Sequence, residues 1–277
     1  ATDMAKKALY ILSEYGYWGA ELLGPLTHLD AAGYEAVFAT PKGKRAHALP
    51  PSYDPTYFDP PLRCNVTEPD IAVKVKALDE SSRLDTVVNL SEWFPERPYF
   101  SEPDFLRQFE AYYNRRAEVW KELEDYSCLV LVGGSGPLID MANNQRVHDA
   151  ILGFHKLDKP VAGICYGVTP LAFAREIDTR KSLIWGKHVT GHCIEYDYKD
   201  GTGFLNTDLN MGPPPYPLEY LLSDAVGPDG QYHGNFGRRT SVIADWPFIT
   251  ARSLQCSFEF GEQLVNMLEK GLRRYGW

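Results

Sequence analysis

The chain has 277 residues, of which 44% are hydrophobic and 23% are charged, and its net charge is −9. These values are typical of a folded globular protein and exclude an intrinsically disordered chain. The negative charge gives no long-range attraction to nucleic acid or to an anionic membrane, so we expect neither as a partner. No apolar run approaches the length of a spanning helix, and the first residues are unlike a secretory leader. Five widely spaced cysteines without a Cys-x-x-Cys pair favour reduced thiols and a cytoplasmic protein.

The first forty residues predict a strand, a helix and a second strand. The strands are expected at 8–12 and 35–39 and the helix at 21–32, with Gly33 where a helix C-cap is expected. Continuous apolar strands that alternate with helices are typical of a parallel sheet covered on both faces. From residue 41 the periodicity disappears, and seven prolines between 41 and 69 predict a long surface loop.

Alternating elements continue through the rest of the chain. The clearest amphipathic helix is predicted at 103–124, either packed on the sheet or capping a pocket. The remaining predictions are helices at 71–78, 144–156, 167–175 and 257–274, strands at 128–132 and 160–164, a loop at 201–217 and a hairpin at 241–250. No linker is evident. We therefore expect a single α/β domain over residues 1–277, in which 44–125 forms an insertion or cap.

The segment Gly163-Ile164-Cys165-Tyr166-Gly167 predicts a nucleophile elbow, because it follows an apolar strand and precedes a helix. Such a turn holds the middle side chain above the carboxyl edge of the sheet, where open α/β sheets place their sites. The start of the following helix should lower the pKa of the thiol. Cys165 is therefore the candidate nucleophile.

A glycine-rich loop, Gly133-Gly134-Ser135-Gly136, follows the strand at 128–132. Its N–H groups are candidates for half of an oxyanion hole, with the amide of Tyr166 as the other half. No Gly-Lys-Ser/Thr follows, so this loop is not a phosphate-binding loop.

These motifs together resemble the ThiJ/PfpI (DJ-one-like) superfamily, and more closely its glyoxalase III-like heat-shock branch. The resemblance rests on Val132–Asp140, Lys159–Gly167, the opening 19–43, a late hairpin at 186–191 and 248–257. It implies a flavodoxin-like three-layer sandwich with a mostly parallel sheet, a cysteine nucleophile elbow and a large insertion. It also implies a homodimer and no cofactor.

The resemblance further implies that Glu21 touches the thiol of Cys165. A carboxyl group beside a thiolate is held protonated, so Glu21 would act as a proton shuttle. Without the resemblance, Glu21 would be a solvated acid in the first turn of its helix.

The sequence departs from the branch at its histidines. The branch has His after the nucleophile and in the glycine loop, where this chain has Tyr166 and Ser135. We expect His192 or His188 to replace the missing base, with Asp197 or Glu195 as the orienting carboxylate. Tyr166 would donate a hydrogen bond to a substrate oxygen or pack on a dimer partner. His188 and His192 would suit zinc on a helix, but their segment predicts strand and turn, so no metal is expected.

Three functions remain open. The first is a cofactor-free, glyoxalase III-like lyase that acts on an α-oxoaldehyde or related carbonyl. The second is a cysteine hydratase or hydrolase of an isocyanide, nitrile or amide, for which the aromatic residues of 91–126 suggest a larger, flatter substrate. The third is a non-enzymatic stress protein in which Cys165 is oxidised. Glutaminase activity is not expected, because the last histidine, His233, lacks the Glu two residues on that such enzymes need.

Overall fold

The computed structural model describes residues 6–98, 101, 103–197 and 217–277. In chain order, the described strands are β1 (Lys7–Ile11), β2 (Glu35–Thr40), β3 (Phe58–Asp59), β4 (Cys64–Asn65), β5 (Val88–Asn89), β6 (Cys128–Leu131), β7 (Val161–Ile164), β8 (His188–Val189), β9 (Gln231–Tyr232), β10 (Val242–Asp245), β11 (Phe248–Ala251) and β12 (Arg274–Tyr275). The described helices are α1 (Gly19–Ala31), α2 (Pro69–Glu80), α3 (Leu90–Trp93), α4 (Phe105–Glu122), α5 (Pro137–Asp140), α6 (Gln145–Lys156), α7 (Thr169–Phe173), α8 (Leu218–Ala225) and α9 (Ser257–Lys270).

A mostly parallel sheet forms the centre of the molecule. Its strand order is β12-β10-β11-β7-β6-β1-β2-β5, and β10 alone is antiparallel to its neighbours β11 and β12. Ile11 of β1 pairs with Leu131 of β6, which pairs with Gly163 of β7. The carboxyl ends of these three strands therefore lie side by side at one edge, where a doubly wound sheet places its site.

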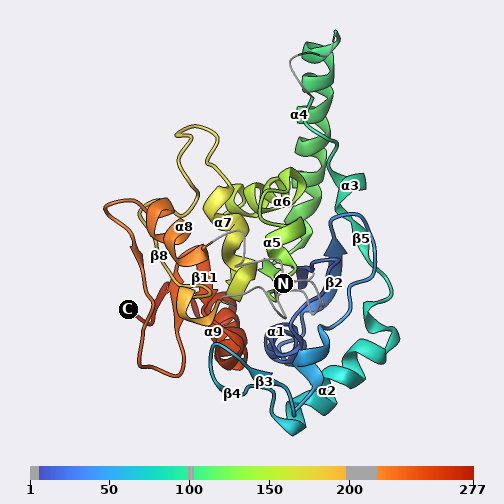
Figure 1. Cartoon of the computed structure of the whole chain (residues 1–277). Coiled ribbons are helices and arrows are strands. Elements are labelled where there is room, and N and C mark those ends of the chain that lie inside the picture. The colour runs from blue at the N-terminus through green and yellow to red at the C-terminus, as the bar shows by residue number, and fades with distance from the viewer. Residues whose placement is uncertain (1–5, 99–100, 102, 198–216) are drawn as a thin grey trace.

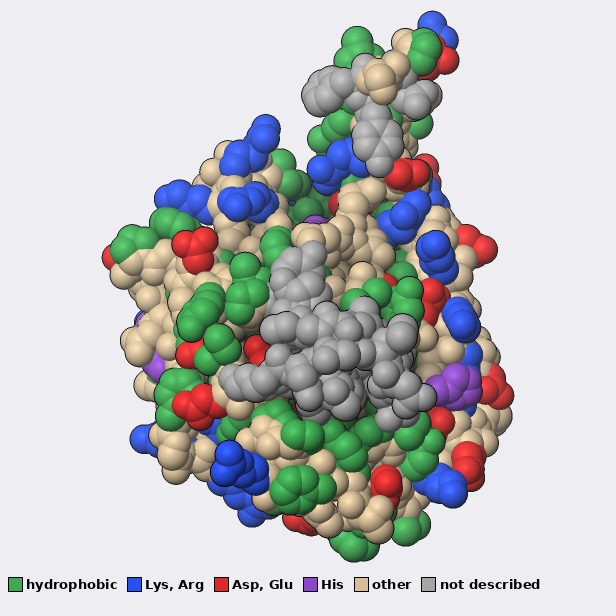
Figure 2. Space-filling view, in the orientation of Figure 1, with side chains coloured by type: hydrophobic (Ala, Val, Ile, Leu, Met, Phe, Trp, Pro, Cys, Tyr) green, Lys and Arg blue, Asp and Glu red, His purple; other side chains and the backbone are tan. Residues whose placement is uncertain are grey.

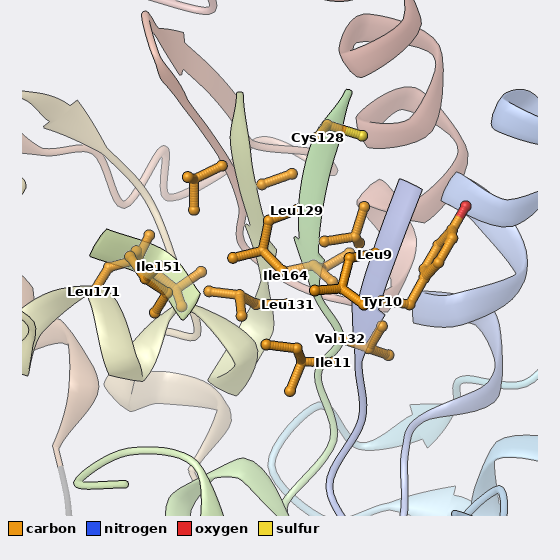
Figure 3. Packing of buried hydrophobic residues seen from close by; sticks show 14 of the residues in the cluster. Leu9, Tyr10, Ile11, Cys128, Leu129, Leu131, Val132, Ile151, Ile164 and Leu171 are labelled. Atoms are coloured by element: carbon orange, nitrogen blue, oxygen red, sulfur yellow. The ribbon is translucent and has the colours of Figure 1, made fainter. Parts of the chain in front are cut away.

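Helices cover both faces of the sheet and give the expected flavodoxin-like three-layer sandwich. On one face α1 packs along α9, with α2 beside α1, and on the other α6 contacts β6, β7 and α7 (Figure 1). The strands read as unbroken apolar runs because both of their faces are buried. Leu9, Leu129 and Ile164 lie in this core without exposure to solvent (Figure 3).

Residues 44–125 add elements outside the sandwich. The expected long loop at 41–70 contains the two-residue strands β3 and β4, which form a small hairpin. The expected helix at 71–78 is the longer α2, which has Pro69 at its first position. This segment also supplies the edge strand β5, which pairs with β2.

The first turns of helix α4 stand out from the body (Figure 1), whereas the part from Tyr112 onward packs against it, with Val119 and Trp120 in the hydrophobic core. The expected packing therefore holds for only part of the helix. Hydrogen bonds to α6 hold the packed part of the helix. The Tyr112 hydroxyl donates to both carboxylate oxygens of the fully buried Asp149 of α6, at 2.8 Å, and Trp120 Nε1 donates to the Asp149 carbonyl oxygen at 2.7 Å. Leu106, near the start of α4, is 79% exposed. Figure 2 shows this part of the chain as a projection from a body whose visible face mixes both signs of charge.

Three further expectations need correction. Helix α9 ends at Lys270 because Gly271 adopts the left-handed conformation, and the chain then adds β12 to the sheet. The elbow is followed by a single turn of 3₁₀ helix and the five-residue α7, not by a helix over 167–175. The expected late hairpin is absent from the described residues, since β8 pairs in parallel with β9. The loop expected at 201–217 lies, except for Pro217, outside the described residues.

The two glycines of the elbow, Gly163 and Gly167, differ in the space that surrounds them, which gives a testable prediction. A Cβ atom on Gly167 would lie 2.5 Å from the carbonyl oxygen of Leu131 and 2.8 Å from that of Val132, both in backbone that cannot yield cheaply. A Cβ atom on Gly163 would meet nothing closer than 3.3 Å. We expect Gly167→Ala to lower the free energy of unfolding by about 3 kcal/mol. Gly163→Ala should change it by less than about 1 kcal/mol, with both values measured by urea denaturation. Equal effects would contradict this account of the elbow.

Candidate active site

Cys165 follows β7 directly and has a φ of +57°. A non-glycine residue in this region is strained, and such strain concentrates at functional sites. The side chain is held at the carboxyl edge of the sheet and is only 7% exposed. The elbow geometry expected from the sequence is therefore present.

Two backbone amides point at the sulfur. The N–H groups of Gly134 and Tyr166 both donate hydrogen bonds to Cys165 Sγ and thereby favour its charged form. An oxygen that develops negative charge on a carbon bonded to Sγ would lie close to the same two donors. This is the arrangement of an oxyanion hole, with one donor from the glycine loop after β6 and one from the elbow.

Glu21 lies in the first turn of α1 and is 1% exposed. Its carboxyl group is hydrogen-bonded to the Cys165 side chain and to the amide of Gly134. Burial raises the pKa of Glu21 to about 8, and this effect outweighs the two hydrogen bonds. Glu21 is therefore mostly protonated at neutral pH.

The expectation that the pKa of Cys165 falls is wrong. Burial raises the pKa of this thiol well above its ordinary value, and the charge that Glu21 would carry raises it further. The two amides oppose this change without cancelling it. The helix after the elbow is too short to add a large dipole, since α7 has five residues. The resting nucleophile is thus a thiol that needs a base.

His192 is in place to be that base. Its Nδ1 atom lies 3.1 Å from Cys165 Sγ, and its Nε2 atom lies 3.0 Å from Oδ1 of Asp197. Among the described residues Nε2 has no hydrogen-bond partner, so its closeness to Asp197 does not by itself set the tautomer of the ring. A ring that carries its proton on Nε2 would leave the Nδ1 lone pair facing the thiol. Cys165, His192 and Asp197 thus lie beside one another in the order of a Cys-His-Asp triad, without a hydrogen bond between His192 and Asp197.

Tyr166 holds the triad from the other side. Its ring stacks on the His192 ring with centroids 3.9 Å apart, and its hydroxyl donates to the same Asp197 oxygen that faces His192. The Tyr166 hydroxyl, expected to meet a substrate oxygen or a dimer partner, is thus engaged by Asp197 within the chain.

A model of the family described as ThiJ/PfpI family-like matches residues 12–192, which is well over half of the chain. The chain belongs to this family. Its ThiJ/PfpI-like fold is also similar to solved structures, at identities that show the fold alone. Glyoxalase III from Candida albicans is 16% identical, with 96% of this chain and 98% of the other covered and a TM-score of 0.64. The Rapid Encystment Protein of 24 kDa from Francisella tularensis is 17% identical, with coverage of 95% and 99% and a TM-score of 0.57.

DJ-1beta from Drosophila melanogaster is 17% identical to this ThiJ/PfpI-like chain, with coverage of 96% and 91% and a TM-score of 0.50. No curated protein sequence matches the chain. Among the described residues, no helix is long and apolar enough to cross a bilayer.

Two of the candidate residues of this ThiJ/PfpI-like protein lie away from the thiol. His188 bonds through Nδ1 to Nε2 of His233 at 2.7 Å and stacks on Trp277, so it is not the alternative base. Glu195 is exposed, whereas Asp197 is the carboxylate whose oxygen lies 3.0 Å from His192 Nε2. The choice between these pairs depends on the course of an irregular segment, which the sequence pattern did not fix.

A cavity of about 60 Å³ opens above the thiol. The expected residues Glu21, Gly134, Ser135, Tyr166 and His192 line it. Sequence analysis missed the remaining described lining residues, which are Trp18, Asp59, Leu62, Tyr196, Ser253, Leu254 and Gln255. Asp59 and Leu62 come from the β3–β4 hairpin, within a segment that has no periodicity to reveal it. None of the described aromatic residues of 91–126 lines the cavity, so they give no support to a larger substrate.

A wider groove of about 830 Å³ lies beside α5 and the turn after β2. The described residues that line it include no cysteine, serine or histidine. The smaller cavity is therefore the candidate site, because Cys165 lines it.

Burial of Glu21 makes the stability of this ThiJ/PfpI-like protein depend on pH. Its pKa is about 8 in the fold against an ordinary value of 4.5, so between these values the folded state binds more protons than the unfolded state. The resulting stabilisation is complete below pH 4.5 and is lost as the pH rises through about 8. We expect the urea midpoint of the wild type to fall, relative to that of Glu21→Gln, between pH 5 and about 8.5. Glu195→Gln removes an exposed carboxylate, so the difference between its urea midpoint and that of the wild type should not change with pH in this way. If the urea midpoints of wild type and Glu21→Gln run parallel across this pH range, Glu21 does not have the raised pKa.

Proposed function

We propose that this protein is a cofactor-free cysteine enzyme that converts an α-oxoaldehyde into the corresponding hydroxy acid, as a glyoxalase III-like lyase. The observation that carries the proposal is the alignment of Cys165 Sγ, His192 Nδ1 and Asp197, with two amides on the sulfur. Family membership and the likeness to glyoxalase III support it.

The first step is addition of the thiol to the aldehyde carbon. His192 takes the thiol proton as the S–C bond forms, and the aldehyde oxygen receives the electron pair between the amides of Gly134 and Tyr166. Protonation of this oxygen, by His192 or by the neutral Glu21, gives a hemithioacetal.

The second step moves hydrogen within the bound substrate. A base removes the proton from the former aldehyde carbon, and a proton returns at the neighbouring carbonyl carbon, which becomes the hydroxyl-bearing carbon. The former aldehyde carbon is thereby oxidised to a thioester while its neighbour is reduced, so no external oxidant is needed. Water then cleaves the thioester, releases the hydroxy acid and restores the thiol.

A second candidate function is hydration or hydrolysis of an isocyanide, nitrile or amide. The triad geometry favours it, because a base backed by a carboxylate is what activation of a thiol and then of water requires. A redox-sensor function is disfavoured, because readily oxidised cysteines have a low pKa and good exposure, whereas burial raises the pKa of Cys165.

The deciding experiment is product formation by the wild type from methylglyoxal, phenylglyoxal, and small nitriles, isocyanides and amides, with Cys165→Ala protein as the blank. Hydroxy acid formed only by the wild type supports the lyase. Turnover of nitrogen substrates alone replaces the lyase with the hydratase or hydrolase. If no substrate is turned over and mass spectrometry finds Cys165 oxidised, the non-enzymatic redox function becomes the favoured one.

We also propose that the protein forms a homodimer, which light scattering on the purified chain tests directly.

A further inference from the structure

We propose that the β3–β4 hairpin is the specificity element of this site, and that through Asp59 and Leu62 it admits neutral substrates with an apolar group and rejects carboxylates. This inference rests on the proposed function in assuming that Cys165 attacks a small electrophile. It adds the class of electrophile that reaches the thiol.

The chemistry of the cavity wall is the first argument. Trp18, Leu62 and Leu254 give the cavity an apolar surface, to which the rings of Tyr166 and Tyr196 add. Neither Lys nor Arg is found among the described residues that line it. A substrate carboxylate that entered would lose water without gaining a cation, and such desolvation is costly.

Asp59 makes this cost larger, since it adds an acidic residue to the same wall. It is only 8% exposed, and its position is fixed by the turn that follows. Its Oδ2 accepts the N–H of Leu62 at 2.9 Å, and its carbonyl oxygen accepts the N–H of Arg63 at 2.7 Å. The same turn therefore presents the Asp59 carboxylate and the Leu62 side chain to the cavity together.

Arg252 is the cation behind this wall, and it is already engaged. It is 1% exposed and lies against the Tyr196 ring, 5.5 Å from the ring centroid. Its two terminal nitrogens donate to four backbone carbonyl oxygens within 234–239. Its Nε makes no hydrogen bond but is buried, and Arg252 is not among the described residues that line the cavity, so it offers no direct pairing to an anion there.

Two like charges within one small cavity repel each other more strongly than in water, because the effective dielectric constant is lower. We therefore expect a carboxylate-bearing electrophile to react with Cys165 at least about 10-fold more slowly than its neutral counterpart, after correction for intrinsic reactivity. Glyoxylate and other oxo acids would be poor substrates, whereas phenylglyoxal would be a good one.

Alkylation of Cys165 tests this charge selection without any turnover. Iodoacetamide and iodoacetate are a neutral and an anionic reagent of nearly the same size. Their rates at Cys165 would be followed by mass spectrometry in a Cys64→Ser background, because Cys64 is exposed whereas Cys128, Cys193 and Cys256 are buried. The ratio of the two rates, divided by the ratio for mercaptoethanol, reports the selectivity.

We expect this normalised ratio to be at least about 10 in the parent protein and to approach 1 in Asp59→Asn. The asparagine carbonyl can still accept the Leu62 N–H, so the turn should persist, and an unchanged melting temperature would show this. Asp54→Asn is the matched control, because Asp54 lies in the same segment but is fully exposed, and its Oδ1 accepts hydrogen bonds from the N–H and hydroxyl of Thr56. That variant should leave the ratio unchanged.

Leu62→Ala tests the apolar half of the proposal. It should lower kcat/KM for phenylglyoxal by about 10-fold while changing that for methylglyoxal by less than about 3-fold. If kcat/KM falls equally for the two substrates, Leu62 does not select for an apolar group.

The outcomes separate the two proposals. A normalised alkylation ratio near 1 in the parent protein, or one that Asp59→Asn leaves unchanged, overturns the selectivity whatever the enzyme does. Failure of both reagents to reach Cys165 also overturns it, because a neutral electrophile must enter. If the alkylation ratio behaves as expected while no oxoaldehyde is turned over, the proposed charge selection is supported and the proposed lyase activity is overturned.

Discussion

Cys165→Ala is expected to abolish turnover, with a loss of at least about 10³-fold against the wild type for any substrate that the wild type converts. The amides of Gly134 and Tyr166 remain in the variant, but no atom is left to form the covalent intermediate. Product formation and intact-protein mass spectrometry after brief exposure to substrate would measure the loss and the missing adduct.

The fold should survive this change. The position already has a φ of +57°, which alanine and cysteine tolerate about equally, and Cβ is retained. Cys128→Ala is the matched control, since it removes a fully buried thiol from β6 without touching the cavity. It should lower stability by about 1 kcal/mol and leave kcat/KM unchanged. Full activity in Cys165→Ala would remove the basis of the proposed function.

His192→Ala is expected to lower kcat/KM by about 10²–10⁴-fold, the usual contribution of a general base. The effect should be near the upper end because burial raises the pKa of the Cys165 thiol, so little thiolate is present without help. Asp197→Asn should give a smaller loss, since it removes the negative charge 3.0 Å from Nε2 but leaves the ring in place. Steady-state kinetics and the rate of iodoacetamide alkylation should fall together.

His188→Ala is the control for His192→Ala. Both histidines come from the same segment and both stack on an aromatic ring, but His188 faces His233 and Trp277 instead of the thiol. Its replacement should leave kcat/KM within about 2-fold of the wild type. If His188→Ala were the damaging change and His192→Ala the silent one, the triad described here would be wrong.

The strand-to-helix turn at Cys165 could be predicted because two local signals agree there, an apolar strand and glycines on both sides of one nucleophile. The contact between Glu21 and Cys165 had no local signal and came only from the family resemblance. The order of β1, β6 and β7 in the sheet is what brings Glu21, Gly134 and Cys165 together. Parallel pairing of that kind is decided by the whole fold and not by any one segment.

Other features could not be predicted for physical reasons. The direction of the Cys165 pKa shift follows from tertiary burial, whereas the local helix start suggested the opposite. The choice of His192 over His188 depends on the exact path of an irregular segment, where neighbouring residues turn in different directions. Asp59 reaches the cavity through a hairpin of two-residue strands, which is too short to leave a pattern in the sequence.

The strand order also has a consequence for how the protein acquires its chemistry. Glu21 follows β1, Gly134 follows β6 and Cys165 follows β7, so neighbours in space are far apart along the chain. Closing loops of that length carries an entropic cost before any contact can offset it, and such contacts form late in folding. A partly folded or newly synthesised chain would therefore carry an ordinary cysteine, without its acid, its amides or its base. The distinctive reactivity of Cys165 is thus a property of the completed fold, and its appearance during refolding would time the docking of the central strands.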